Sequence, residues 1–98
     1  MGKSYVHEYA GHAFKQFFSL DLPSEMQAAD ILNLEAVKIA MEQLAQPEVD
    51  TLRLVFTSER KTLKESVKEA AQIERMKERE IWRLVRRATN LFAEARVL

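Results

Sequence analysis

Apolar residues recur along most of the chain at steps of three and four, the spacing that places them on one face of an α-helix. The first series predicts a helix over about Ser4–Phe18, and its apolar members are Val6, Ala10, Ala13, Phe14, Phe17 and Phe18. No segment keeps a strict apolar–polar alternation, and no Asn-Gly or Asp-Gly turn occurs, so nothing favours strands. The pattern therefore predicts an all-α fold, a small helical bundle.

Two further apolar faces follow the first. A second helix is expected to end near Ala45, with an apolar face made by Leu34, Val37, Ala40, Met41 and Leu44. Asp30 or Asn33 can cap its start, and Ser24 offers an earlier one. A third helix should begin at Pro47, because proline fits the first helical turn, and it carries Val49, Leu52, Val55 and Phe56. The segment Thr57–Lys61 is then expected to be the connection onward.

The chain beyond Pro47 contains neither glycine nor proline, and from Thr62 to the end it is helical in character. Two capping boxes overlap at its start: Thr62 with Glu65, and Ser66 with Glu69. An unbroken helix from Thr62 would be about 55 Å long, far more than a small core covers. A helix that starts at Ser66 would be short, and a turn would soon follow. Both hypotheses stay open at this point.

The second hypothesis gives the spacing of a helix-turn-helix that ends in a long C-terminal helix. Ala71 is small where two helices would cross closely, and Met76 is apolar where a side chain would fill the angle between them. Ile81 and Leu84 would then face inward. The second helix of the pair would project its polar residues outward, where a DNA major groove would lie: Lys77, Glu78, Arg79, Trp82, Arg83 and Arg86.

Residues 34–95 resemble the promoter-reading C-terminal domain of sigma factors and the sigma-like regulators of phages and mobile elements. That family has a helix similar to Leu34–Leu44, a proline-started helix similar to Pro47–Phe56, a loop and a closing helix-turn-helix. Val67–Ala71 and Arg83–Arg87 are also similar to excisionase-type DNA-binding modules. The resemblance implies a DNA-binding transcriptional regulator or sigma-like adaptor with double-stranded DNA as its partner. The implied DNA contacts are Arg75, Lys77, Arg79, Trp82, Arg83, Arg86 and Arg87.

Three positions differ from that family's usual pattern. Arg75 stands where glycine is usual, so it would have to adopt a left-handed conformation at a cost of about 1 kcal/mol. Glu74, just before it, stands at a position that is usually apolar. Lys77 replaces the Ser or Thr that would cap the next helix, and its ammonium group cannot accept a hydrogen bond from a backbone N–H.

A continuous C-terminal helix explains the same residues differently. A single four-and-three register joins Leu63, Val67, Ala70, Ile81, Leu84, Ala88, Leu91, Ala95 and Leu98. Glu74 and Lys77 occupy its two missing positions. Such a helix would expose a long apolar stripe, which predicts an oligomeric bundle, a homodimer through the C-terminal helix, or a larger assembly. The protein would then be a structural or protein-interaction module, and its basic residues would form a solvated face.

The chain has 98 residues and a formal net charge of zero, which suits a single domain over 1–98. The zero conceals an asymmetry. Residues 1–59 hold four Lys and Arg against nine Asp and Glu, about −5, and residues 60–98 hold eleven against six, about +5. The domain thus has an acidic helical part, 1–58, and a basic helical part, 59–98. The basic part predicts an anionic partner, and the acidic part suggests RNA polymerase or another basic partner.

The composition and the motifs argue against several classes of function. Without cysteine there is no disulfide or thiolate zinc site, and a cytoplasmic setting is expected. No apolar run approaches the roughly 18 residues that span a bilayer, so no membrane partner is expected. His7–His12 looks like a zinc-protease motif, but its histidines are too far apart around a helix to share one metal, so no metal site is predicted. No nucleophile with a base can be assembled, which argues against an enzyme and against a cofactor.

Overall fold

The computed structural model describes residues 3–19, 24–58 and 62–97, with side chains from residue 8 onward. Helices occupy most of these residues: α1 Lys3–Ser19, α2 Ala28–Glu42, α3 Gln46–Thr57, α4 Leu63–Glu74 and α5 Glu78–Arg96. Since the described residues contain no strand, the predicted all-α fold is confirmed. Parts of the two predicted connections, 20–23 and 59–61, lie outside the described residues, as do Leu98 and the side chains of Val6 and His7.

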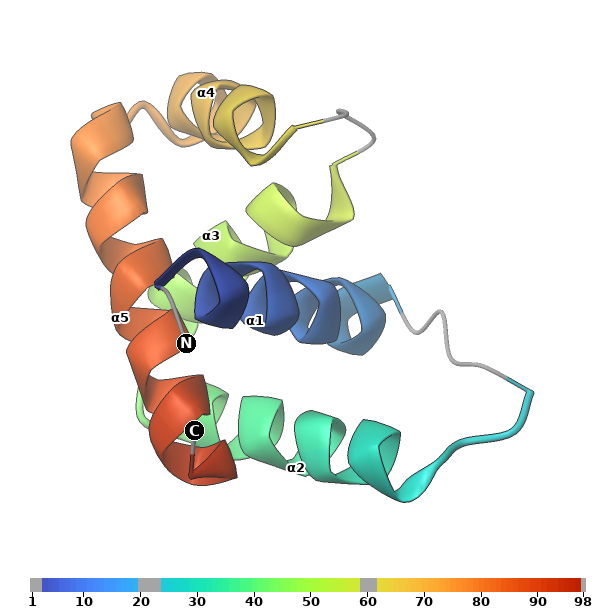
Figure 1. The fold of residues 1–98 in the computed structure, drawn as a ribbon. Coiled ribbons are helices and arrows are strands. Elements are labelled where there is room, and N and C mark those ends of the chain that lie inside the picture. The colour runs from blue at the N-terminus through green and yellow to red at the C-terminus, as the bar shows by residue number, and fades with distance from the viewer. Residues whose placement is uncertain (1–2, 20–23, 59–61, 98) are drawn as a thin grey trace.

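The long helix α5 organises the bundle, because it contacts each of the other four helices. It runs along one side of the molecule, as Figure 1 shows, with α1 between α2 and the α3–α4 pair. The packing of α5 against α2 and of α3 against α4 is the most extensive. The position of α5 therefore depends on helices from the whole length of the chain.

Three phenylalanines from three helices form the centre of the core. Phe14 of α1 packs against Phe56 of α3 and Phe92 of α5, with ring centroids 5.0 and 5.8 Å apart. All three side chains are buried. Tilted and edge-on ring pairs of this kind are favourable, and burying each side chain stabilises the fold by roughly 1.5–3 kcal/mol. Phe14 and Phe56 belong to the apolar series predicted from the sequence, whereas Phe92 lies one residue beyond Leu91 of the predicted register.

Carboxylates in the first turns fix the starts of α2 and α3. The backbone N–H of Gln27 donates to Asp30 Oδ2 at 3.1 Å, and that of Ala45 donates to Glu48 Oε1 at 2.9 Å. Because Asp30 acts from the third helical position, α2 begins at Ala28, and the predicted start at Asp30 or Asn33 is wrong. Its predicted end at Ala45 also lies beyond the observed end at Glu42.

Asn33 is buried, 6% exposed, and links three helices instead of capping one. Its Oδ1 accepts hydrogen bonds from the Tyr9 hydroxyl of α1 at 3.1 Å and from Arg96 Nε of α5 at 2.8 Å. Arg96 Nη2 also donates to the Tyr9 hydroxyl oxygen at 3.4 Å. The hydrogen bond from Arg96, followed by that with Asn33, lowers the pKa of the Tyr9 phenol below its ordinary value. One buried amide thereby connects both ends of the chain to α2.

The start of α4 resolves the choice between the two capping boxes. Thr62 is the N-cap, and its Oγ1 accepts from the backbone N–H of Glu65 at 3.2 Å. Ser66 is buried inside the helix, where its hydroxyl donates to the Thr62 carbonyl oxygen at 3.2 Å. The helix nevertheless ends at Glu74. The expectation that a start at Thr62 implies an unbroken helix is therefore wrong.

A left-handed residue breaks the C-terminal segment into two helices. Arg75 has φ 54° and ψ 43°, and the N–H of Met76 donates back to the Ala71 carbonyl at 3.0 Å, which closes the end of α4. Met76 packs against the core, and Leu84 and Ala88 are buried within the bundle. The predicted continuous helix over 62–98 is wrong, because its apolar register is divided between two helices and covered. The stripe proposed for a homodimer through the C-terminal helix is largely occupied by the protein's own core.

Candidate nucleic-acid interface

The buried residues of α5 determine which of its residues face solvent. Its buried side chains include Ile81, Leu84, Val85, Ala88 and Phe92. At about 100° per residue, the opposite side of the helix carries Arg79, Arg83, Arg86 and Asn90, all of them exposed. These four residues form a row about 16 Å long at 1.5 Å per residue. Core packing therefore points the row directly at solvent.

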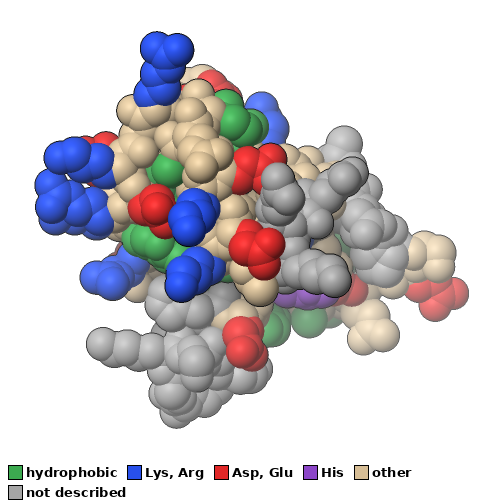
Figure 2. Space-filling model, turned by 90° about the horizontal axis from the view of Figure 1, so that it is seen from above, with side chains coloured by type: hydrophobic (Ala, Val, Ile, Leu, Met, Phe, Trp, Pro, Cys, Tyr) green, Lys and Arg blue, Asp and Glu red, His purple; other side chains and the backbone are tan. Residues whose placement is uncertain are grey.

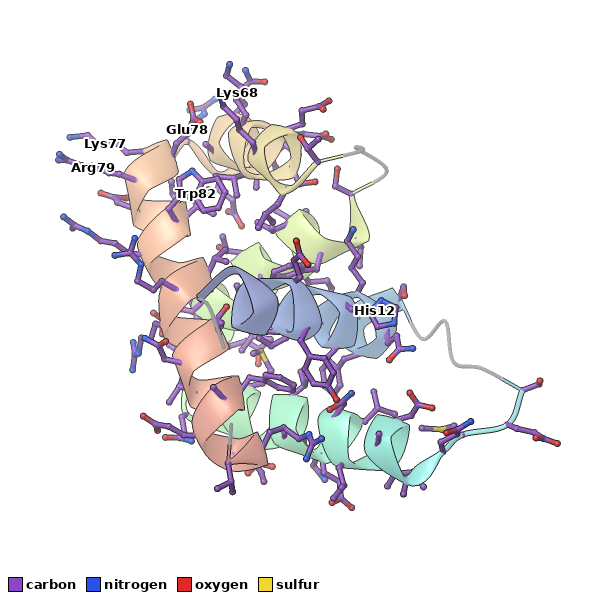
Figure 3. All side chains as sticks on the ribbon, viewed as in Figure 1. His12, Lys68, Lys77, Glu78, Arg79 and Trp82 are labelled. Atoms are coloured by element: carbon purple, nitrogen blue, oxygen red, sulfur yellow. The ribbon has the colours of Figure 1, made fainter. Side chains whose placement is uncertain are left out.

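The turn before α5 adds two more cations next to Arg79, at the N-terminal end of the row. Arg75 and Lys77 are both exposed. Lys77 is the N-cap of α5 and, as its chemistry requires, makes no side-chain capping hydrogen bond, so its ammonium group stays in solvent. Figure 3 shows Lys77 and Arg79 projecting away from the bundle, with Glu78 beside them. We call Arg75, Lys77, Arg79, Arg83 and Arg86 the basic row.

The charges of the basic row are not neutralised by neighbours. Within the residues that the structure describes, no carboxylate lies within ion-pair distance of any of its five members. Figure 2 shows Lys and Arg side chains gathered at the edge of the molecule where α5 lies. Two acidic residues, Glu78 and Glu80, stand in the first turn of α5, where the positive end of the helix dipole favours them. The exposed Glu94 lies one turn after Asn90, so the face is positive in the middle and carries acidic groups at both ends.

Two of the residues predicted as DNA contacts lie elsewhere. Trp82 is half-buried and packs against the core, and in the view of Figure 3 it lies on the other side of α5 from Lys77 and Arg79. Arg87 is exposed, but its Nη1 is 3.4 Å from Glu48 Oε2 of α3, within hydrogen-bond and ion-pair range. The structure brings the other five predicted residues together and gives these two contacts within the bundle.

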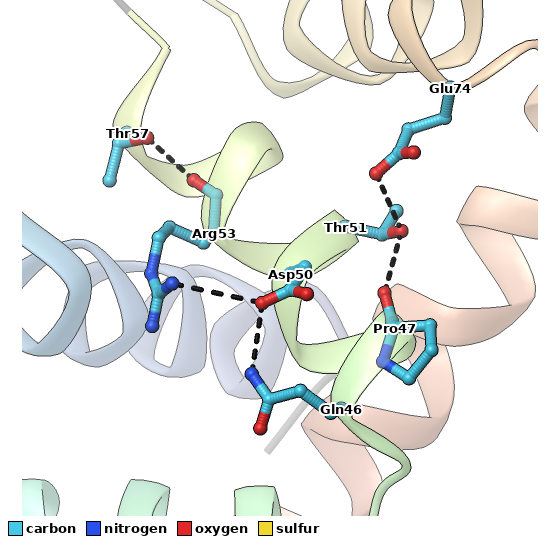
Figure 4. Close-up of polar contacts among 7 residues, drawn as sticks. All are labelled: Gln46, Pro47, Asp50, Thr51, Arg53, Thr57 and Glu74. Carbon is cyan, nitrogen blue, oxygen red and sulfur yellow. Dashed lines mark hydrogen bonds and ion pairs between the residues drawn. The ribbon is translucent and has the colours of Figure 1, made fainter.

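Glu74 shows how α3 supports the turn. Its carboxylate is half-buried, and Oε1 accepts from the hydroxyl of the buried Thr51 at 3.2 Å. The same hydroxyl lies 3.0 Å from the Pro47 carbonyl oxygen, as Figure 4 shows. The carboxylate can stay half-buried here because α3 supplies a hydrogen-bond donor. This contact ties the last residue of α4 to α3, directly before the turn.

The sequence analysis missed two candidate contacts. Asn90 continues the basic row four residues after Arg86, and the four-three-four spacing from Arg79 would have found it. Lys68 is exposed on α4 and, in Figure 3, projects outward from that helix. Since Lys64 lies one turn earlier and is also exposed, the i, i+4 spacing was the available signal for this side of α4.

Other chemistry finds little support in the described part of the chain. His12 is exposed on α1, and no group of three or more His, Cys, Asp or Glu side chains there could hold a metal ion. None of the described helices combines the length and the apolar character needed to cross a membrane.

Comparison with protein-family models, with curated proteins and with solved structures found no match to this chain.

Proposed function

We propose that this chain binds double-stranded DNA through α5 and the turn before it, as a small transcriptional regulator or sigma-like adaptor. The observation that carries the proposal is the basic row: five cations without ion-pair partners in the described chain, three on α5, whose opposite face is buried, and two in the turn before it. A B-DNA major groove is about 12 Å wide and admits an α-helix. In two-helix DNA-binding motifs the second helix enters that groove while the first crosses the backbone.

The side chains of the basic row suit two kinds of contact. Arg79, Arg83 and Arg86 carry planar guanidinium groups, which bind phosphates or the O6 and N7 acceptors of guanine with two parallel hydrogen bonds. Arg75 and Lys77, at the turn, are placed to neutralise phosphates beside the groove. In this proposal Lys68 of α4 meets the backbone on the other flank. Trp82 and Arg87 act as positioning residues, since their contacts lie within the bundle.

Salt dependence tests the proposal directly. Binding of a fluorescent mixed-sequence duplex is measured by anisotropy at several salt concentrations. If about five cations displace counterions, log Kd against log salt concentration should have a slope of magnitude about 4 to 5, with affinity falling as salt rises. A face that is merely solvated would give no measurable binding even at low salt, and that result would overturn the proposal.

A matched pair of variants locates the interface. Arg83→Gln/Arg86→Gln removes two charges from the basic row, and Lys15→Gln/Arg53→Gln removes two exposed charges from α1 and α3. The first variant should lose affinity and reduce the magnitude of the slope by about 2, whereas the second should change the slope little. Equal losses for the two variants would mean that net charge, and not this face, governs binding.

A further inference from the structure

The outer face of α2 exposes three large aliphatic side chains beside the charged Glu35, Lys38 and Glu42, and the rest of the described chain does not cover it. Ile31 is 47% exposed, Leu32 48% and Ile39 47%. The inner face of the same helix buries Ala36, Val37, Ala40 and Met41 in the core. A helix with aliphatic side chains on both sides is typical of one buried on both sides. Among the residues that the structure describes, no element packs over this side of α2, which its aliphatic side chains would favour.

We propose that this face of α2 pairs with the same face of a second copy of the chain, with the two helices antiparallel about a two-fold axis. Leu32 and Ile39 are seven residues apart, so they share one line along the helix, as the seam residues of paired helices do. Ile31 lies beside that line. A two-fold interface is self-complementary: if a residue of one copy contacts a second residue of the other copy, the reverse contact forms as well.

Charge complementarity favours a second copy over other occupants. Glu35 and Lys38 are exposed on this face, three residues and about 4.5 Å apart along the helix. Within the described chain neither has an ion-pair partner. When two such helices run antiparallel, Glu35 of each copy can face Lys38 of the other, so one arrangement pairs all four charges. These pairs would set the register, and the aliphatic side chains would supply the driving force.

An apolar groove lies on the flank of α2 that faces away from Leu32 and Ile39. It has a volume of about 600 Å³, and its lining includes Phe17 and Phe18 of α1 and Leu34 of α2. Glu35 and Lys38 also border it, so the charged pair lies between the groove and the exposed aliphatic residues. At about 100° per residue, Leu34 lies roughly 140–160° around the helix from Leu32 and Ile39, so the groove stays outside the proposed pairing.

The proposed dimer would leave the basic row free. In Figure 1, α2 lies at the opposite end of the bundle from α4 and the start of α5. The pairing therefore does not rest on DNA binding, and either proposal can fail without the other. If both hold, each dimer presents two basic rows.

Sedimentation equilibrium over a range of concentrations tests the pairing. The average mass of the wild type should rise from that of one chain to that of two and go no further, because a two-fold interface closes. Leu32→Ser/Ile39→Ser should remain monomeric. The matched control Ile73→Ser replaces an aliphatic residue that is 60% exposed on α4 and should associate like the wild type. Circular dichroism confirms that each variant is folded.

Charge reversal tests the antiparallel register. Glu35→Lys and Lys38→Glu, taken singly, should each weaken dimerisation by about tenfold, because each places like charges opposite one another. The double variant Glu35→Lys/Lys38→Glu restores opposite charges and should return association to near the wild-type value. A monomer at every concentration, assembly beyond two copies, or a double variant as weak as the single ones would overturn the proposal.

Discussion

The two helices α2 and α5 pack against each other, yet they present opposite chemistry to solvent. The outward face of α5 carries Arg79, Arg83 and Arg86, whereas that of α2 carries Leu32 and Ile39. Their inward faces are alike, small and aliphatic residues mixed with one or two larger ones. Because the shared core requires only the inward faces, the outward faces are where the helices differ. A charged face stays hydrated until it meets an anion, and an apolar face gains free energy from any partner that excludes water.

The largest expected effect is a loss of stability when a charge is placed on the buried face of α5 and not on its exposed face. Leu84 is 8% exposed in the core, so Leu84→Glu buries a carboxylate without a partner and should lower the free energy of unfolding by more than about 4 kcal/mol. Its neighbour Arg83 is exposed, and Arg83→Glu should change stability by no more than about 0.5 kcal/mol. Urea unfolding followed by circular dichroism measures both. A stable Leu84→Glu variant would mean that this face of α5 is open to solvent.

The next effect concerns the link between α2 and α5. Asn33→Ala removes the acceptor shared by Tyr9 and Arg96, and should cost about 1–3 kcal/mol because two donors lose a partly buried partner. Asn90→Ala, at an exposed position of α5, is the control and should cost little. Thermal unfolding compares them. Equal stabilities for the two variants would show that the buried amide contributes nothing to holding the helices together.

A substitution in the turn between α4 and α5 is expected to make the protein more stable. Arg75 is left-handed, a conformation that glycine adopts without penalty, so Arg75→Gly should stabilise the protein by about 1 kcal/mol. Lys77→Gly is the control, since φ is −77° there and glycine offers no such relief. If Arg75→Gly destabilised the protein, the turn would have to adopt a different backbone conformation in solution. The same variant should reduce the magnitude of the DNA salt slope by about 1.

The smallest effect is on pH dependence at the junction of α1, α2 and α5. The pKa of Tyr9 is lowered in the folded protein, mainly by Arg96, so Tyr9 should release its proton at a lower pH when folded than when unfolded. Its contribution to stability is therefore present above the unfolded pKa and is lost as pH falls through the folded one. Ultraviolet absorbance of the phenolate, compared between the wild type and Tyr9→Phe, measures this titration. An unshifted titration would contradict the contact with Arg96.

Much of the local structure was predictable from the sequence. The spacing of Ala10, Ala13 and Phe14 predicted a helix, and these three residues are fully buried. The sequence also indicated that a turn near Arg75 would require a left-handed residue. The starts of α2 and α4 were harder to predict, because several residues in each region can cap a helix. Tertiary contacts determine which of them does. Binding to DNA or RNA polymerase, a cytoplasmic setting, a phage or mobile-element origin and the absence of catalysis stay predictions.

The amino-acid sequence by itself determined which residues share a helical face and how charge divides between the two halves of the chain, because both depend on neighbours along the backbone. The tertiary structure alone decided which of those faces lose contact with water. A four-and-three register continues across a turn as readily as through a helix, so the register could not separate one long helix from α4 and α5. Packing within the bundle covers Leu84 and Ala88 and leaves Ile31 and Ile39 exposed. The net charge of zero is the sum of the acidic first part of the chain and the basic second part, whose cations gather on α5 and the turn before it.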